Sequence, residues 1–157
     1  MPANPSCLDA SLFRARQQEI PFPYRKNSSM TNRIIQQYVF PQLRVRDWKR
    51  AHQFYVEGLG FQVDWTHQFE AGFPVFAQVS REGRALFLTE HAGDCEPGGA
   101  AYIVLDDLDA FYHEVLQRGI VQPEPPSETP WGRCEMHLVD PDGNRLRFAA
   151  PISSQNQ

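Results

Sequence analysis

Hydrophobic and polar residues alternate along several short stretches of the chain, which is the pattern of half-buried β-strands. After residue 144, for example, Leu146 and Phe148 fall on one side of the chain, and Arg145 and Arg147 fall on the other. The pattern predicts strands at residues 37–45, 62–68, 75–81, 84–90, 100–105 and 133–139, and a last strand after residue 144. Loops are predicted at 91–99 and, because of its prolines, at 123–130.

Two other stretches have apolar residues at helical spacing. The first follows Asp47, whose side chain suits a helix N-cap, and ends at Gly58 and Gly60. The second follows Asp107 and ends at Gly119. Their apolar positions are Trp48, Ala51, Phe54 and Tyr55 in the first helix, and Leu108, Phe111, Tyr112, Val115 and Leu116 in the second. The predicted order of elements is therefore β-α-β-β-β, twice.

The two halves of the chain match each other at a constant separation. Four pairs of residues lie 60 positions apart: Val45 and Leu105, Asp47 and Asp107, Gly83 and Gly143, and Leu86 and Leu146. Such a repeat indicates a duplicated unit, with modules at about 35–91 and 99–150. Because one helix covers one face of each small sheet, two units side by side are expected to form a cupped mixed sheet in an α+β fold.

Composition and charge exclude several classes of protein. The 157-residue chain has a net charge of −4, which provides no basic field for nucleic acid, and no apolar run approaches the roughly 20 residues of a membrane span. Its cysteines (Cys7, Cys95 and Cys134) lack C-x-x-C spacing and are interpreted as free thiols, which favours the cytoplasm.

Residues 1–33 are predicted to be a disordered leader, with a transit peptide as the alternative. Residues 34–152 are predicted to form the folded domain, and residues 153–157 a tail.

Several short motifs occur in a recognisable order. They are Leu43-Arg44-Val45-Arg46-Asp47, Phe54-Tyr55, Leu59-Gly60-Phe61, Val104-Leu105-Asp106-Asp107-Leu108 and, most specific, Asp140-Pro141-Asp142-Gly143-Asn144. With them the chain resembles, over about residues 37–151, the glyoxalase/bleomycin-resistance/extradiol-dioxygenase superfamily, also called vicinal oxygen chelate (VOC) proteins. The segments at 89–91 and 130–132 are most similar to the bleomycin-resistance branch. The resemblance implies the VOC fold and a homodimer with exchanged halves.

The resemblance also implies where enzymes of the superfamily hold a divalent metal. The four corresponding positions are occupied by Phe40, Phe87, Ala100 and Arg147. None of these side chains offers a metal-ligating oxygen or imidazole nitrogen, so we expect no family metal site, no cofactor and no metal-dependent catalysis. The alternative is a glyoxalase-type, metal-dependent lyase or isomerase whose site is built elsewhere, from Glu90, His91, Glu135 and His137.

Without a metal, aromatic side chains are the candidates for holding a large flat ligand, because they provide contact area at low entropic cost. Trp131 is the strongest candidate, since it lies in a loop bounded by proline and glycine and matches the Trp-Gly of the resistance proteins. The predicted ligand-binding residues are Trp65, Phe76, Phe87, Glu90, Tyr102, Trp131, Gly132, Glu135 and Arg147.

The resemblance further implies a ligand, because the superfamily's resistance proteins bind bleomycin-like glycopeptides in grooves at a dimer interface. Bleomycins are cationic, so Glu90, Asp94 and Glu135 favour such a ligand, whereas Arg145 and Arg147 oppose it. We therefore predict antibiotic resistance by sequestration of a bleomycin-like glycopeptide, without catalysis. An accessory domain that binds small aromatic molecules is a further possibility.

Overall fold

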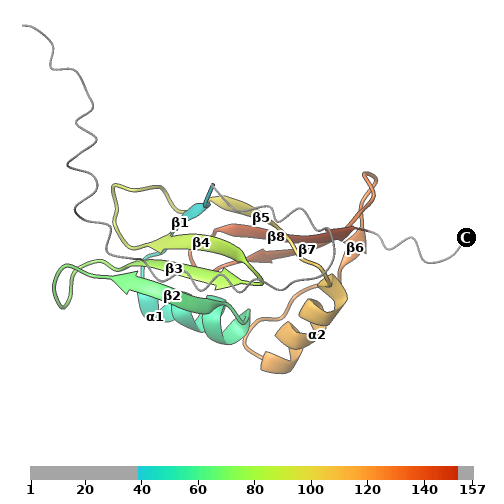
Figure 1. Ribbon diagram of the computed structural model, residues 1–157, viewed down its shortest axis with the longest axis horizontal. Coiled ribbons are helices and arrows are strands. Elements are labelled where there is room, and N and C mark those ends of the chain that lie inside the picture. The colour runs from blue at the N-terminus through green and yellow to red at the C-terminus, as the bar shows by residue number, and fades with distance from the viewer. Residues whose placement is uncertain (1–38, 152–157) are drawn as a thin grey trace, which may run out of the picture. The chain divides into compact units, whose positions relative to one another are not determined.

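The structure is a computed structural model, and it describes residues 39–151 (Figure 1). The first module consists of β1 (Gln42–Arg44), α1 (Trp48–His52), the π-helix η2 (Gln53–Gly58), β2 (Gln62–His67), β3 (Phe76–Arg81) and β4 (Arg84–Thr89). The second consists of β5 (Ala100–Val104), α2 (Leu108–Arg118), β6 (Ser127–Glu128), β7 (Arg133–Val139) and β8 (Arg145–Pro151). The predicted two-module α+β fold is confirmed. The predicted leader (1–33) and tail (153–157) lie outside the described residues.

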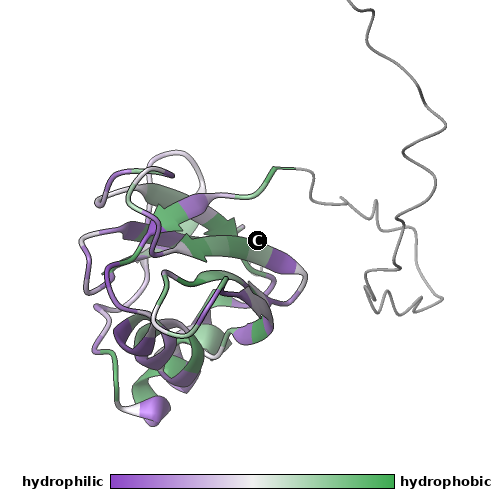
Figure 2. Ribbon diagram, turned by 90° about the vertical axis from the view of Figure 1, so that its left-hand side faces the viewer, coloured by the Kyte–Doolittle hydropathy of each residue, from purple (hydrophilic) through white to green (hydrophobic). Residues whose placement is uncertain are grey.

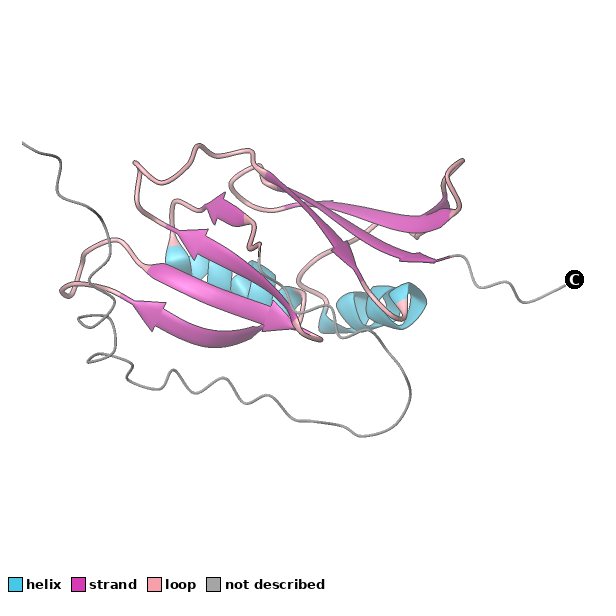
Figure 3. Cartoon of the chain, turned by 45° about the horizontal axis from the view of Figure 1, so that its top comes forward, coloured by secondary structure: helices cyan, strands magenta, loops and turns pink. Residues whose placement is uncertain are grey.

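Each module forms its own four-stranded sheet, so the described strands belong to two sheets and not to one continuous sheet (Figure 3). The strand orders are β1-β4-β3-β2 and β5-β8-β7-β6. In each sheet the first strand runs parallel to the last, and the other pairs are antiparallel, so both sheets are mixed as expected. The helical segment of each module connects the two edge strands of its sheet.

The 60-residue repeat predicted from the sequence is confirmed by the pairing of the strands. Leu43 lies opposite Leu88 in the first sheet. Ile103 lies opposite Phe148 in the second sheet, 60 residues further along in both strands. The parallel pair of strands therefore has the same register in the two modules.

Both helical segments begin where the sequence predicts them. The Oδ1 atom of Asp47 accepts a hydrogen bond from the amide of Arg50 at 2.7 Å, and that of Asp107 accepts one from the amide of Ala110 at 2.9 Å. Each carboxylate satisfies an amide that the first helical turn leaves unpaired. The second helix ends at Gly119, whose φ of 70° lies in the left-handed region that favours glycine. No helix in residues 39–151 is long and apolar enough to cross a membrane.

The first helical segment differs from the prediction of a uniform α-helix. After His52 it widens into the π-helix η2, and at its end the amide of Leu59 donates to the carbonyl of Phe54 at 3.0 Å, five residues back. Over a single turn, apolar spacing does not distinguish a π-helix from an α-helix, so the sequence predicts only a helix.

The predicted bounds of one strand and one loop were wrong. Residues 37 and 38 of the predicted strand at 37–45 lie outside the described residues, and within 39–45 β1 occupies only Gln42–Arg44. Pro41 directly before it has no amide hydrogen to donate, which shortens the ladder. Conversely, the predicted loop at 123–130 contains the edge strand β6, which pairs with β7. A two-residue strand is too short to produce an alternating pattern.

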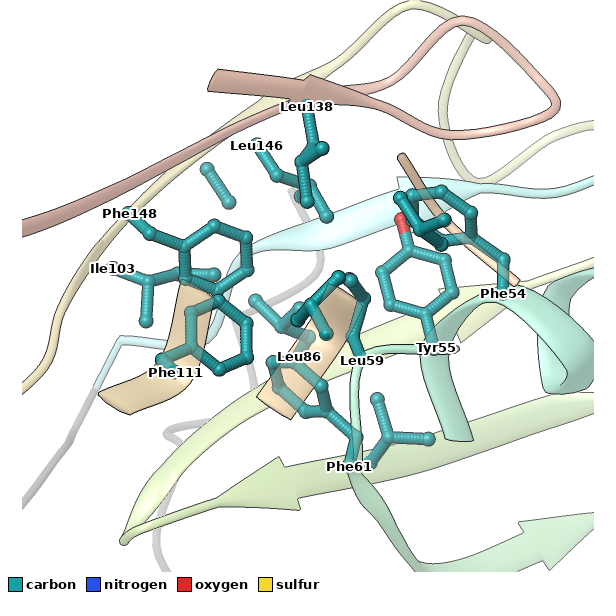
Figure 4. Close-up of a cluster of buried hydrophobic side chains, with 14 of the residues drawn as sticks. Phe54, Tyr55, Leu59, Phe61, Leu86, Ile103, Phe111, Leu138, Leu146 and Phe148 are labelled. Atoms are coloured by element: carbon teal, nitrogen blue, oxygen red, sulfur yellow. The ribbon is translucent and has the colours of Figure 1, made fainter. Parts of the chain in front are cut away.

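The two modules share one hydrophobic core (Figure 4). Leu59, Phe61 and Leu86 of the first module belong to the same buried cluster as Phe111 and Phe148 of the second, whose ring centroids are 4.7 Å apart. Figure 2 shows hydrophobic residues concentrated on the strands, with hydrophilic residues between them and along the helices. Because the core uses the inner face of each sheet, the outer faces are available for other contacts.

The Asp-Pro-Asp-Gly-Asn turn joins the second module to the first. The hydroxyl of Tyr55 donates to Oδ2 of Asp140 at 2.8 Å. The amide nitrogen of the Asn144 side chain donates to the carbonyl of Arg44 at 2.8 Å, and its Oδ1 accepts from the amide of Gly99 at 2.9 Å. Burial, followed by the negative charge of Asp140, raises the pKa of Tyr55 well above its ordinary value, so this hydroxyl remains a donor. The predicted turn is therefore also a joint between the modules.

A second joint connects β3 to α2. The guanidinium of Arg81 donates to both carboxylate oxygens of Glu114, at 2.6 and 3.1 Å. Its central carbon lies 4.7 Å from the ring centroid of Phe111, close enough for a cation–π contact. Arg118 also donates to Glu114, at 3.0 Å from its Nε. Arg81 and Glu114 are distant in sequence, and the periodic patterns contain no sign that they pair, whereas Arg118 and Glu114 are four residues apart on α2.

Candidate functional site

The outer face of the first sheet carries a group of half-buried rings. Leu86 and Leu88 of β4 are buried in the core, so Phe87 between them points to the opposite face. Its neighbours across the ladder on this face are Gln78 and, beyond it, Trp65. We refer to these rings as the aromatic surface, which comprises Phe40, Trp65, Phe76 and Phe87.

Phe87 is at the centre of the aromatic surface. Its ring centroid lies 5.0 Å from that of Phe40, 5.3 Å from Phe76 and 5.8 Å from Trp65. The centroids of Trp65 and Phe76 are 5.6 Å apart. These spacings are typical of aromatic pairs in contact. The structure therefore brings together three of the predicted ligand-binding residues and adds Phe40 to them.

A β-bulge gives the aromatic surface a polar edge. The register between β2 and β3 shifts between Val63 and Trp65, so Asp64 has no ladder partner. Its side chain instead accepts hydrogen bonds from Gln78 and Ser80, both at 2.8 Å, and these two residues lie on the same face as Trp65. A bulge inserts one extra residue and re-aims the side chains around it. The alternating pattern alone does not reveal this, and the sequence analysis missed Asp64.

The outer face of the second sheet is organised around Glu135, whose side chain is almost fully buried. Its Oε1 accepts hydrogen bonds from the hydroxyl of Tyr102 at 2.8 Å and from the indole Nε1 of Trp131 at 3.0 Å. Its Oε2 lies 3.2 Å from Nε2 of His137 and 3.5 Å from Nε of Arg147. We call these five residues the Glu135 network. The predicted placement of Glu135 and His137 on one strand face is confirmed.

The partners of Glu135 keep it ionised. Burial by itself raises the pKa of this carboxyl group. Hydrogen bonds from Tyr102, Trp131 and His137, and the positive charge of Arg147, outweigh that effect and lower the pKa below its ordinary value. The pKa of Tyr102, which donates to this carboxylate, is raised mainly by burial and further by its hydrogen bond with Glu135 and the negative charge of that residue. The network is therefore a neutral phenol, a neutral indole and a carboxylate facing basic side chains.

Trp131 is presented by a tight turn between β6 and β7. The amide of Gly132 donates to the carbonyl of Thr129 at 3.1 Å, and the amide of Thr129 donates to the carbonyl of Arg133 at 2.8 Å. Gly132 has a φ of 76°, which favours glycine at this position. The indole is 63% exposed although its Nε1 is bonded to Glu135. The turn thus offers one face of an oriented ring to solvent.

The positions at which the superfamily's enzymes hold a metal do not fit one here. Phe40 and Phe87 stack on each other on the first sheet, with an interplanar angle of 16°. On the second sheet, Ala100 lies opposite Arg145, and Arg147 lies opposite Tyr102. Two phenyl rings, a methyl group and a guanidinium provide no donor for a divalent cation.

Glu90 is placed differently from the other predicted ligand-binding residues. Its Oε1 accepts from the amide of Trp48, and its Oε2 accepts from the amide of Val75, both at 2.7 Å. Both oxygens therefore bind backbone amides of the first module, whereas Glu135 and His137 lie on the second sheet. Residues 39–151 contain no group of three or more His, Cys, Asp or Glu side chains that could hold a metal. The described residues therefore do not bring the four side chains of the alternative metal site together.

The family model for glyoxalase superfamily proteins matches residues 26–155. The chain belongs to the glyoxalase superfamily. One relative is the uncharacterized protein YraH of Bacillus subtilis strain 168, which is 25% identical over 118 residues, 68% of this chain and 92% of YraH. The resemblance inferred from the sequence motifs is confirmed.

Solved structures of this superfamily have the same fold. A bleomycin-binding protein in complex with bleomycin is 27% identical, with a TM-score of 0.58 over 73% of this chain and 98% of that protein. TnmS3, an antibiotic-binding protein from Streptomyces sp. CB03234, is 28% identical, with a TM-score of 0.56 over 80% of this chain and 99% of TnmS3. This glyoxalase superfamily member is thus similar in structure to proteins that bind antibiotics.

Proposed function

We propose that this protein sequesters a small organic molecule without transforming it, and that the ligand is a bleomycin-like glycopeptide antibiotic. The observation that carries the proposal is the presence of oriented, partly exposed aromatic rings on the outer face of each sheet. The lack of metal donors at the family positions supports binding over catalysis. The similarity to a bleomycin-binding protein supports the choice of ligand.

The chemistry of the two outer faces suits a ligand with a flat aromatic part. The aromatic surface presents ring contacts centred on Phe87, and the Glu135 network holds Trp131 in place with one hydrogen bond. Rings held in this way provide contact area without losing rotamer freedom on binding. The buried carboxylate also explains why Trp131 remains oriented although its ring faces solvent.

The proposal includes a cytoplasmic homodimer with exchanged halves, as in the bleomycin-resistance branch. In a single chain, the inner faces of both sheets are used by the shared core. A groove with two walls would therefore need outer faces supplied by two copies. In such a dimer, the ligand would lie between an aromatic surface and a Glu135 network.

Thermal unfolding with and without metal-free bleomycin tests the proposal. A ligand at about 100 times its Kd should add roughly 2.7 kcal/mol to the free energy of unfolding. Bleomycin recovered from the mixture should have an unchanged mass, because the protein only binds it. Trp131→Ala should reduce the shift, whereas Phe69→Ala, which removes a 71% exposed ring from the β2–β3 loop, should not. Unchanged stability at saturating bleomycin, or a modified product, would contradict the proposal.

A further inference from the structure

The outer face of the second sheet carries an excess of positive charge. Arg133 and His137 of β7 and Arg145 and Arg147 of β8 share this face, because their ladder partners place them on the same side. Glu135 is the one acidic residue among the paired outer-face positions of this sheet. The described part of the chain therefore has three arginines against a single carboxylate on this surface.

The negative charge of Glu135 is already neutralised within the protein. Each of its two oxygens has two partners, and one of these is the guanidinium of Arg147. Glu128 of β6 pairs with Cys134, which packs against the hydrophobic core. This ladder position lies on the opposite face of the sheet from Glu135 and the arginines. No second carboxylate of the sheet offsets the arginines.

The guanidinium groups retain free donors. Arg147 uses only its Nε toward Glu135, and its Nη atoms have no hydrogen-bond partner within residues 39–151. The side chains of Arg133 and Arg145 likewise form no hydrogen bond or ion pair with the described residues. A guanidinium is planar and binds carboxylate, sulfonate or phosphate groups through two parallel hydrogen bonds.

The guanidinium of Arg147, which faces Glu135 with its Nε, lies next to an aromatic ring. Its central carbon is 6.0 Å from the ring centroid of Tyr102. Tyr102 and Trp131 both donate to the same oxygen of Glu135, which ties the two side chains to one acceptor. A flat ring in contact with Trp131 or Tyr102 would place a substituent within reach of Arg147.

We propose that this surface binds a planar aromatic anion, with its acidic group on Arg147 and its ring on Trp131 and Tyr102. The inference rests on one part of the proposed function, the sequestration of a small organic molecule, and assigns to the outer face of the second sheet an anionic ligand class, unlike cationic bleomycin. Arg147 is the residue that determines specificity, and Glu135 is a positioning residue that orients the two rings. Aromatic ligands with a negative charge bind more tightly here than neutral or cationic ligands of the same shape.

A matched pair of probes tests the proposal on the full-length protein. 2-Naphthoate and 2-naphthamide have the same ring and nearly the same shape, and differ by one negative charge. Calorimetric titration should give an affinity for 2-naphthoate about tenfold or more above that for 2-naphthamide, since a charge-assisted bidentate contact is lost in the amide. Raising the salt concentration should weaken the binding of 2-naphthoate only.

Substitutions test whether Arg147 is responsible for the preference for 2-naphthoate. Arg147→Gln should lower the affinity for 2-naphthoate about tenfold and leave that for 2-naphthamide unchanged. Arg147→Lys, which retains the charge but not the planar fork, should have an intermediate effect. Arg50→Gln, which removes an exposed guanidinium from α1, is the control and should change neither affinity. The melting temperature of each variant checks that it is folded.

The possible results separate this inference from the proposed function. Equal affinities for the two probes would overturn the anion preference, while leaving small-molecule binding in place. An Arg147→Gln variant that still prefers 2-naphthoate would also overturn it. Preference for 2-naphthoate without any binding of bleomycin would support the inference and overturn bleomycin as the ligand in the proposed function. If neither probe binds at millimolar concentration, the inference is wrong, and the bleomycin titration alone decides the proposed function.

Discussion

The hydroxyl of Tyr55 donates a 2.8 Å hydrogen bond to the carboxylate of Asp140, and so connects the π-helix of the first module with the last turn of the second. Both groups are buried. A buried polar contact of this kind is costly to break, because the acceptor cannot be rehydrated without opening the core. The most specific sequence motif of the chain therefore holds the modules in the arrangement that leaves their outer faces open.

Removing this hydroxyl should destabilise the protein without changing its core volume. Tyr55→Phe should lower the free energy of unfolding by about 1–2 kcal/mol, since Asp140 loses one donor. Urea unfolding at neutral pH measures the change. Tyr112→Phe is the matched control, because its hydroxyl forms no hydrogen bond with the described residues, and it should stay within about 0.5 kcal/mol of the wild type. Equal effects of the two substitutions would contradict the assigned joint.

The side chain of Asn144 should contribute more than the hydroxyl of Tyr55. It donates to the carbonyl of Arg44 and to Asp140, and it accepts from the amide of Gly99. Asn144→Ala removes one hydrogen-bond partner from each of these three groups at once and should cost about 2–4 kcal/mol in urea unfolding. Asn144→Asp retains the size but removes the donor and places a second carboxylate beside Asp140, so it should not restore stability. A fully stable Asp variant would show that the amide donor is not needed.

Acid should weaken the second joint. The hydrogen bond from Arg81 lowers the pKa of Glu114 below 4.5; burial opposes this effect, and Arg118 adds to it. Because the pKa is lower in the folded state, the stabilisation is complete above about pH 4.5 and is lost as the pH falls through the folded-state value. The difference in unfolding free energy between the wild type and Glu114→Gln should therefore shrink from pH 6 toward pH 3. The effect is small, since the carboxyl is partly exposed. A difference that grows on acidification would contradict the account.

The aromatic surface depends on its central ring. Phe87 contacts three other rings, so Phe87→Ala should cost about 2 kcal/mol and weaken the binding of an aromatic ligand. The emission of Trp65 should shift to longer wavelength, because its indole loses an apolar neighbour. Phe69→Ala removes a mostly exposed ring elsewhere in the same module and should change neither property. Ligand affinity that survives the loss of Phe87 would place the site elsewhere.

Much of the fold follows from local patterns in the sequence. The caps at Asp47 and Asp107 and the glycine stop at Gly119 have local physical causes, so they are visible without a structure. Strand alternation also predicted that Glu135 and His137 share a face. These features depend on residues near one another in the chain, and the repeat is visible as a constant separation of 60 residues between matching positions.

The features that the sequence does not reveal depend on contacts between distant residues or on small changes in register. The bulge at Asp64 shifts the pairing of one strand by a single residue, which alternation does not record. The contacts of Glu90 with the amides of Trp48 and Val75 were not predicted, because the tertiary fold brings those amides to it. The sequence analysis named each partner of Glu135 as a candidate site residue. It did not predict that they contact one carboxylate, because this depends on the turn that carries Trp131.

The most direct test of the central claim is a calorimetric titration of metal-free bleomycin into the wild-type protein and into Trp131→Ala. The account predicts binding at micromolar affinity or better, with about one ligand per chain, and a clear loss of affinity in the variant, because Trp131 offers the most exposed oriented ring of the site. A titration that shows no heat of binding at any temperature tested, or equal affinities for the two proteins, would contradict it.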